Sequence, residues 1–253
     1  MVIIKTPDEI AKLRKGGPIA AGILRSLAQA VKPGITTESL DMLARTLIRD
    51  AGATPAFLGY RPSNEKNAFP AALCTSVNDE IVHGVPTGRI LNAGDIISID
   101  LGLKYEGVYL DLATTVAVGK ISHPDANLLA VTEAALEVGI AAIAPGGTVG
   151  DIGAAVYTYI SDNGFEIVSA LAGHGVGRAI HEDPYVPNYG KKGKGEKLVP
   201  GMVIAIEPIV TAGKDSMKVL SDEYTIVTKD GSRAAHFEHT VLITETGAEI
   251  LTK

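Results

Sequence analysis

The sequence predicts an α+β fold made of two halves that are related by a pseudo-twofold axis. Two observations lead to this prediction. Residues 33–52 recur as residues 145–164, and each copy is followed by the same order of a His-x-x-Pro turn and two acid-bearing strands. A third observation, four carboxylates inside apolar segments, predicts what the two halves build together.

The repeated segment aligns without a gap, and each copy has the signals of a capped helix. A Pro-Gly turn and a threonine N-cap precede an amphipathic helix that ends at glycine. Two segments of this length would share about one identity by ordinary composition, far fewer than are found. The identical pairs are Pro33, Gly34, Thr36, Thr46, Ile48, Asp50 and Gly52 with Pro145, Gly146, Thr148, Thr158, Ile160, Asp162 and Gly164.

The parallel between the halves continues into the strands. Residues 91–100 match residues 198–207, because both have a turn glycine, a β-branched run and a final acid, which is typical of a buried strand. Before them, residues 83–86 match residues 181–184 as the His-x-x-Pro turns. The alternative, coincidence with shared turn chemistry, explains the common order less well.

We therefore expect one catalytic domain over residues 1–253, with pseudo-repeats at approximately 7–120 and 125–250. Each half would contribute helices and antiparallel strands to a curved sheet that the helices cover. The acids of the two halves would meet at the axis.

The acids within the apolar strands predict a metal site. They are Asp100, Asp111, Glu207 and Glu238. A buried carboxylate must be protonated, paired with a cation or bound to a metal. A salt bridge would be the better explanation for any one acid, but these strands contain almost no lysine or arginine. Two divalent ions explain all four acids, and carboxylates with an imidazole suit manganese, iron, cobalt or zinc.

Three histidines are candidates for this site. His174 lies between two glycines and has no counterpart in the other half, so we interpret it as the imidazole ligand rather than an ordinary loop residue. His83 and His181 stand at equivalent positions before their acidic strands. That placement suits two groups that flank one substrate, although both could simply form turns with the proline that follows.

The remaining histidines and the cysteine are assigned other roles. His236 and His239 flank Glu238, and we expect strand alternation to send both to the face opposite that acid, as packing groups or groups behind the ligands. His123 is expected in a solvated loop. No Cys/His signature surrounds Cys74, so a buried or pocket-lining thiol is favoured over a nucleophile.

Composition restricts the setting. The net charge of −6 argues against a nucleic-acid partner, and a single cysteine cannot form an internal disulfide, which favours a reducing compartment. The chain begins without a signal-peptide pattern, since Thr6, Pro7 and Glu9 predict a capped helix start, and no uncharged apolar stretch is long enough to span a membrane. We expect a soluble cytoplasmic protein.

At these residues the chain closely resembles the type I methionine aminopeptidases. The segments that carry the resemblance span nearly the whole chain: 57–60, 74–78, 83–86, 94–100, 107–115, 173–184, 201–208 and 237–240. The resemblance implies the pita-bread fold. It also implies one metal ion held by Asp111, His174, Glu207 and Glu238, and a second held by Asp100, Asp111 and Glu238.

By the same resemblance, a pocket for the methionine side chain is lined by Phe57, Tyr60, Phe69, Cys74 and Tyr224. The chain departs from the family pattern at three places. Residues 61–67 look like a short insertion, Tyr224 stands where many bacterial relatives have tryptophan, and Ile180 stands where they have an aromatic residue.

The implied reaction is removal of the initiator methionine from nascent proteins with a small second residue. A hydroxide that bridges two divalent ions about 3.5–4 Å apart would attack the methionine carbonyl. Glu207 would accept a proton, His181 would stabilise the oxyanion, and His83 would hydrogen-bond the scissile amide. The expected partners are the N-termini of nascent polypeptides, with ribosome association compatible with this role, and the chain is expected to act as a monomer.

Three alternatives use similar residues. An Xaa-Pro aminopeptidase or prolidase has a similar metal set but usually an extra N-terminal domain, for which the helix start at Pro7 is expected to leave no room. A non-catalytic peptide-binding member of the fold would not need both histidines and all five ligands. A two-metal phosphoesterase is the third, and a phosphatase assay would distinguish it.

Overall fold

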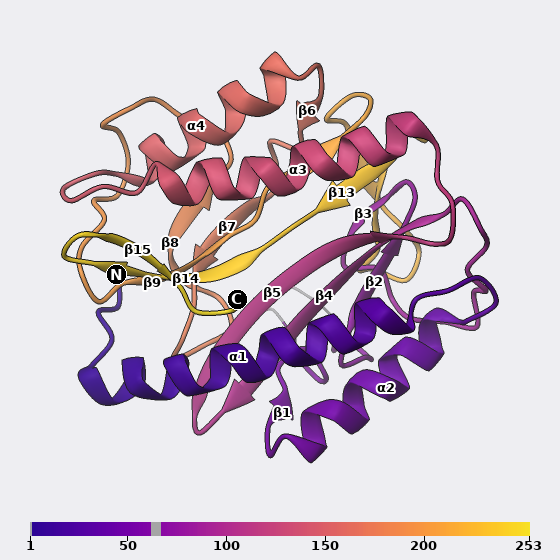
Figure 1. Ribbon diagram of the computed structural model, residues 1–253, viewed down its shortest axis with the longest axis horizontal. Coiled ribbons are helices and arrows are strands. Elements are labelled where there is room, and N and C mark those ends of the chain that lie inside the picture. The colour runs from indigo at the N-terminus through magenta and orange to yellow at the C-terminus, as the bar shows by residue number, and fades with distance from the viewer. Residues whose placement is uncertain (1, 62–66) are drawn as a thin grey trace.

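The computed structural model describes residues 2–61 and 67–253, and it has helices and antiparallel strands in both halves of the chain (Figure 1). Residues 62–66, most of the segment interpreted as an insertion, lie outside the described residues. The helices are α1 (Pro7–Ala30), α2 (Thr37–Asp50), α3 (His123–Ala141) and α4 (Val149–Asp162). The first-half strands are β1 (Thr54–Pro55), β2 (Cys74–Val77), β3 (Glu80–Val82), β4 (Ile96–Tyr105) and β5 (Val108–Ala117). The second-half strands are β6 (Glu166–Ile167), β7 (Ala172–Gly175), β8 (Glu182–Pro187), β9 (Val203–Ile206), β10 (Ile209–Thr211), β11 (Met217–Val219), β12 (Ile226–Thr228), β13 (Ala234–His236), β14 (His239–Thr244) and β15 (Gly247–Ile250).

Three of the helices begin where the sequence predicts. The capping box at α1 is present, since the Thr6 hydroxyl accepts from the Glu9 N–H and the Glu9 carboxylate accepts from the Thr6 N–H. Thr36 and Thr148 are the N-cap residues of α2 and α4, as expected from the repeat. One expectation was wrong: His123 is exposed but forms the first residue of α3 rather than a loop, because Ser122 caps that helix.

The strands of the two halves pair in the same order. In the first half, the long strand β4 pairs with β5 on one edge, and with β2 and then β1 on the other. In the second half, β9 and β10 together replace β4: they pair with β14 and β13 on one edge, and with β7 and β6 on the other. The antiparallel bridge between Ala113 and Glu238 joins the two halves.

The second half differs from the first because both of its central strands are interrupted at the acids. Glu207 and Pro208 separate β9 from β10, and Phe237 and Glu238 separate β13 from β14. Proline has no N–H to give to a ladder, so a continuous strand is not possible at Pro208. In the first half β4 continues past Asp100 to Tyr105, and Asp100 is therefore in the middle of a strand rather than at its end.

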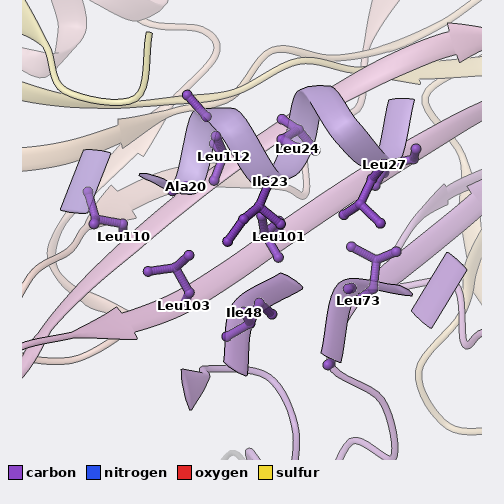
Figure 2. Packing of buried hydrophobic residues seen from close by; sticks show 14 of the residues in the cluster. Ala20, Ile23, Leu24, Leu27, Ile48, Leu73, Leu101, Leu103, Leu110 and Leu112 are labelled. Atoms are coloured by element: carbon purple, nitrogen blue, oxygen red, sulfur yellow. The ribbon is translucent and has the colours of Figure 1, made fainter. Parts of the chain in front are cut away.

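Each helix pair covers the strands of its own half, with α1 and α2 on one side of Figure 1 and α3 and α4 on the other. The fully buried residues of the core beneath α1 are aliphatic, and Figure 2 shows side chains of α1 such as Ile23 and Leu24 gathered with Leu101 of β4 and Leu112 of β5. A second cluster lies beneath α3 and α4 and includes Ile152, Val156 and Ile206. These two cores fix the acid-bearing strands from the outer face.

The aliphatic core predicts a large effect of truncation beneath α1. Leu27 is fully buried, whereas Met42, on α2, is 57% exposed. Leu27→Ala should lower the free energy of unfolding by roughly 2–5 kcal/mol, through lost burial and the cavity that remains. Met42→Ala should change it by less than about 0.5 kcal/mol. Urea denaturation followed by circular dichroism measures both, and equal effects would contradict this packing.

Candidate metal centre

One cavity contains every residue that the sequence predicted for the site. Its volume is about 390 Å³, within the range of small-molecule sites. The predicted residues that line it are Phe57, Tyr60, Phe69, Cys74, His83, Asp100, Asp111, His174, His181, Glu207, Tyr224 and Glu238. Other lining residues, including His236, were not predicted for the site.

The four acids converge from four different strand segments. Asp100 and Asp111 come from the hairpin of β4 and β5, and Glu207 and Glu238 come from the two interruptions in the second half. Ligand atoms of Asp100, Asp111 and Glu238 all lie within 4.8 Å of one another, and so do those of His174, Glu207 and Glu238. Asp111, His174 and His181 form a third group of this kind.

The carboxylates lack a lysine or arginine partner among the described residues, and a divalent cation would supply the missing positive charge. Asp100 Oδ1, Asp111 Oδ1 and Glu238 Oε1 are buried without a hydrogen-bond partner. Burial raises the pKa of Asp100 to about 7 and, with the neighbouring carboxylates, raises the pKa values of Asp111 and Glu238 well above their ordinary range. Within the described ranges, the ion-pair partners of these acids are histidines and no lysine or arginine. Two or more buried carboxylates without a cation partner fit a divalent metal ion.

His174 is oriented as a metal ligand. Its Nδ1 lies 2.9 Å from the carbonyl oxygen of Gly175, and since a carbonyl can only accept, Nδ1 carries the proton. Nε2, the ring nitrogen left for a metal ion, faces the carboxylates, 3.5 Å from Glu207 Oε1 and 3.8 Å from Asp111 Oδ2. A backbone acceptor that fixes the tautomer in this way is the usual arrangement behind a metal-bound histidine.

Two contacts position Glu207, one to its backbone carbonyl and one to its carboxylate. The side-chain amide of Asn188 donates to the Glu207 carbonyl at 2.8 Å. His236 Nε2 lies 3.4 Å from Glu207 Oε2 and 3.9 Å from Glu238 Oε2. Burial by itself would raise the pKa of Glu207, but the contact with His236 and the charge of His174 outweigh it and lower that pKa. Glu207 is thus ionised at neutral pH.

The expectation that His236 faces away from Glu238 was wrong. Residues two apart on a strand lie on the same face, and His236 precedes Glu238 by two positions, so simple alternation already predicts that both side chains point to the site. His239, one position after the acid, does point away, and its Nδ1 lies 3.0 Å from Thr252 Oγ1. The role expected of His236, a group behind the ligands, agrees with its contact with Glu207.

His83 and His181 both lie at the cavity, as their equivalent positions in the repeat indicated. His83 has a positive φ of 57°, an uncommon backbone conformation for a residue with a side chain. His181 Nδ1 lies 2.8 Å from the Tyr60 hydroxyl, and its ring contacts that of His174 at a centroid distance of 4.5 Å. Both histidines line the cavity and keep accessible surface. Burial lowers the pKa of His83, and burial with the nearby His174 lowers that of His181 to about 3.

The segment that carries His181 is anchored by its neighbour, Glu182. One carboxylate oxygen forms a buried ion pair with Lys5 at 2.6 Å. The other accepts from the backbone N–H groups of Arg178 and Ala179. The carboxylate therefore ties the turn before His181 to the N-terminal segment.

The rest of the cavity is apolar and aromatic. The Phe69 ring makes edge contacts with Phe57 and Tyr224, at centroid distances of 6.5 Å and 5.2 Å. Cys74 is buried, as expected, and burial with the nearby carboxylates raises the pKa of its thiol well above the ordinary value, so it is not a nucleophile at neutral pH. Ile180 packs with Phe57 and Phe69 in the same cluster.

Sequence reasoning missed the part of this wall that comes from short strands of both halves and from the residue before β7. The missed apolar residues are Val82, Leu171, Ala172, Ile209, Val219 and Ile226. They carry no motif, and only the pairing of β3 with β12 brings Val82 beside Ile226. The one usable signal was Ile209, because it follows Glu207 by two positions on the chain.

Comparison with known proteins identifies the family. The model of metallopeptidase family M24 matches residues 11–245. The chain belongs to this family. Methionine aminopeptidase 1 of Bacillus subtilis is 47% identical over 253 residues and is matched over all of both chains, and the methionine aminopeptidase of Clostridium acetobutylicum is 45% identical over 253 residues, all of this chain and 99% of the relative.

Solved structures of the M24 type confirm the fold. The methionine aminopeptidase of Rickettsia prowazekii superposes with a TM-score of 0.96 at 36% identity, over 100% of both chains. Prolidase from Pyrococcus furiosus superposes with a TM-score of 0.79 at 26% identity, over 99% of this chain and 65% of that one. The predicted α+β pita-bread fold is therefore confirmed. Among the described residues, no helix is both long and apolar enough to span a membrane.

The raised pKa of Asp100 predicts how pH affects the metal-free protein. Its carboxyl is protonated in both states below the unfolded pKa of about 3.9, and between there and the folded pKa of about 7 the folded state binds more protons. Stability should therefore fall as pH rises through this window. In chelator, Asp100→Asn should melt higher than the parent protein at pH 7.5 and equally at pH 4. Melting curves across pH that show no such divergence would contradict the assignment.

Proposed function

We propose that this chain is a methionyl aminopeptidase that removes the N-terminal methionine from nascent proteins whose second residue is small. One observation supports this most: a carboxylate and imidazole cluster able to hold metal shares one cavity with an apolar, aromatic wall. The full-length relatives at 40–47% identity named methionine aminopeptidase support the same activity.

The metal content belongs to this proposal. A metallopeptidase of this family uses divalent metal, and the cluster fits two ions of cobalt, manganese, iron or zinc. Asp111, His174, Glu207 and Glu238 would hold one, and Asp100, Asp111 and Glu238 the other. Such ions supply Lewis-acid activation of the scissile carbonyl and of water at neutral pH.

The side chains around the cluster have the protonation states that peptide hydrolysis requires. Glu207, ionised because its pKa is lowered, is the base that accepts a proton from water. Burial raises the pKa of Tyr60, so its hydroxyl keeps its proton and can donate it to His181 Nδ1. A neutral His181 then carries its own proton on Nε2, where it can donate to the oxyanion of the tetrahedral intermediate. His83 would hydrogen-bond the scissile amide.

The apolar wall is the proposed binding site for the methionine side chain. The residues that line this part of the cavity are Phe57, Tyr60, Phe69, Cys74 and Tyr224. Their aromatic rings suit a flexible thioether, which makes favourable contacts with ring edges. His181 is near both parts of the cavity, since it contacts Tyr60 and lies within 4.8 Å of ligand atoms of Asp111 and His174, and together with His83 it would contact the substrate backbone.

The alternatives are less well supported. Prolidases share the fold, but this chain spans 65% of the Pyrococcus furiosus protein and all of the methionine aminopeptidases named above. A peptide-binding member without catalysis would not need the complete set of acids and histidines in one cavity. The proposal further includes a single catalytic domain, a monomeric state, a cytoplasmic location and contact with the ribosome.

Loss of His181 should affect the reaction and not the metal. His181→Ala should lower kcat by about 10²–10³, the usual effect of removing one donor to the oxyanion, while metal content by atomic emission stays at the parent level. His123→Ala, at the exposed start of α3, is the control and should keep parent kcat. Unchanged kcat in His181→Ala, or loss of its metal, would contradict the assigned role.

Substrate competition tests the function itself. A mixture of Met-Ala-Ser and Ala-Pro-Ser peptides, followed by mass spectrometry, should show release of methionine and no release of alanine, since the apolar wall suits the thioether. Met-Leu-Ser should be cleaved slowly, because the family resemblance implies a small second residue. Preference for the proline peptide would place the chain with the Xaa-Pro peptidases instead.

A further inference from the structure

The seam between the two halves is held by side-chain hydroxyls where a β-ladder would have backbone pairs. At its centre Ala113 and Glu238 exchange two backbone hydrogen bonds, of 3.3 and 3.0 Å. In a regular antiparallel ladder the next hydrogen-bonded pairs would be Asp111 with Thr240 and residue 115 with His236. Neither backbone pair forms.

Thr240 replaces the first missing pair. Its Oγ1 donates to the Asp111 carbonyl at 2.7 Å and accepts from the Asp111 N–H at 3.0 Å. The backbone of Thr240 is not available for these bonds, because its N–H donates to Thr252 Oγ1 and its carbonyl accepts from Leu251 N–H. The hydroxyl thus satisfies both backbone groups of Asp111 on this edge.

Thr115 replaces the second missing pair from the opposite strand. Its Oγ1 donates to the His236 carbonyl and accepts from the His236 N–H, both at 2.8 Å. Its second lone pair faces Ser98 Oγ at 2.8 Å, and since the one Thr115 proton is already used, Ser98 is the donor. The two threonines therefore make the same reciprocal contact, one from each half.

These contacts are in the dry interior, beside the groups that repel one another. Thr240 and Thr115 are 0% and 3% exposed, and Asp111 and Glu238 are 3% and 2% exposed. When both carboxylates ionise, as metal binding requires, their like charges push the facing strands apart, and a single backbone bridge opposes this. Water cannot take over a hydroxyl contact at such buried positions, so its loss leaves the Asp111 or His236 backbone without a partner.

We propose that Thr115 and Thr240 are positioning residues that set the separation of the Asp111 and Glu238 carboxylates, and hence the affinity of the site for divalent metal. The inference rests on the metal site proposed above. Elsewhere in the sheet, backbone hydrogen bonds hold neighbouring strands at a fixed separation, and at the seam the two hydroxyls do this instead. Thr240 holds Asp111, and Thr115 holds the His236 segment that leads into Glu238.

Metal affinity, measured apart from activity, tests the proposal. Isothermal titration of the metal-free protein with Mn²⁺ would compare the parent with Thr240→Val and Thr115→Val, which keep the side-chain shape and remove the hydroxyl. Loss of a group that orients a ligand typically weakens metal binding about 10–100-fold, and we expect this in both variants. Thr240→Ser restores the hydroxyl and should bind Mn²⁺ as the parent does.

Thr132→Val is the matched control. Thr132 on α3 is also fully buried and its hydroxyl donates to the Leu128 carbonyl, but this contact lies within one helix and does not cross the seam. This variant removes a buried threonine hydroxyl without leaving the backbone of Asp111 or His236 unpaired, and it should keep parent Mn²⁺ affinity. Weaker binding in Thr132→Val equal to that in Thr240→Val would overturn the proposal, because general destabilisation would then explain both.

The remaining outcomes are also decisive. Parent affinity in both seam valine variants, or weak binding in Thr240→Ser equal to that in Thr240→Val, would overturn the role of the hydroxyls. If Thr240→Val does not regain a native circular dichroism spectrum, the Thr240→Ser and Thr240→Ala pair replaces it, and equal Mn²⁺ affinity in that pair would overturn the proposal. Absence of Mn²⁺ binding in the parent would instead contradict the metal site itself.

Discussion

Repulsion among buried carboxylates is the constraint on which the rest of this structure depends. Asp111 and Glu238 face each other in the interior without a lysine or arginine partner among the described residues, and burial together with nearby carboxylates raises the pKa of both. Such an arrangement persists only if packed elements hold the strands in place and a cation can enter. The aliphatic cores beneath α1 and beneath α3 and α4 supply the first condition.

The duplicated architecture explains how one chain brings these acids together. Each half supplies a pair of antiparallel strands with one acid on each, and the bridge of Ala113 with Glu238 joins the pairs. The halves then diverge. The first keeps continuous strands, so its acids are fixed by the ladder, whereas the second interrupts both strands, which lets Glu207 and Glu238 turn toward the hairpin. The histidine at 174, absent from the first half, makes the site asymmetric.

Chemistry and specificity come from different parts of the cavity. The carboxylates of Asp111 and Glu238 lie at the seam, where backbone and hydroxyl contacts hold the two halves together. The apolar wall comes from β2, β12 and the segments around Phe57 and Phe69, which are joined mainly by ring contacts. A relative could therefore change its substrate through the wall while the metal centre stays the same, consistent with a fold shared by prolidases and methionine aminopeptidases.

The sequence by itself predicted three of the helices, the matching order of strands in the two halves, and a set of residues that line one cavity. Caps at Thr6 and Thr36 are local signals, and acids in apolar strands such as Asp100 require a cation wherever they lie. The sequence also indicates that His236 lies on the same face as Glu238, because residues two apart on a strand share a face; the expectation that it faces away was wrong. Only the tertiary structure decided which short strands close the pocket and that hydroxyls of Thr115 and Thr240 span the seam. Local patterns fix which way a side chain points, whereas contacts between residues more than a hundred positions apart depend on how the two halves dock.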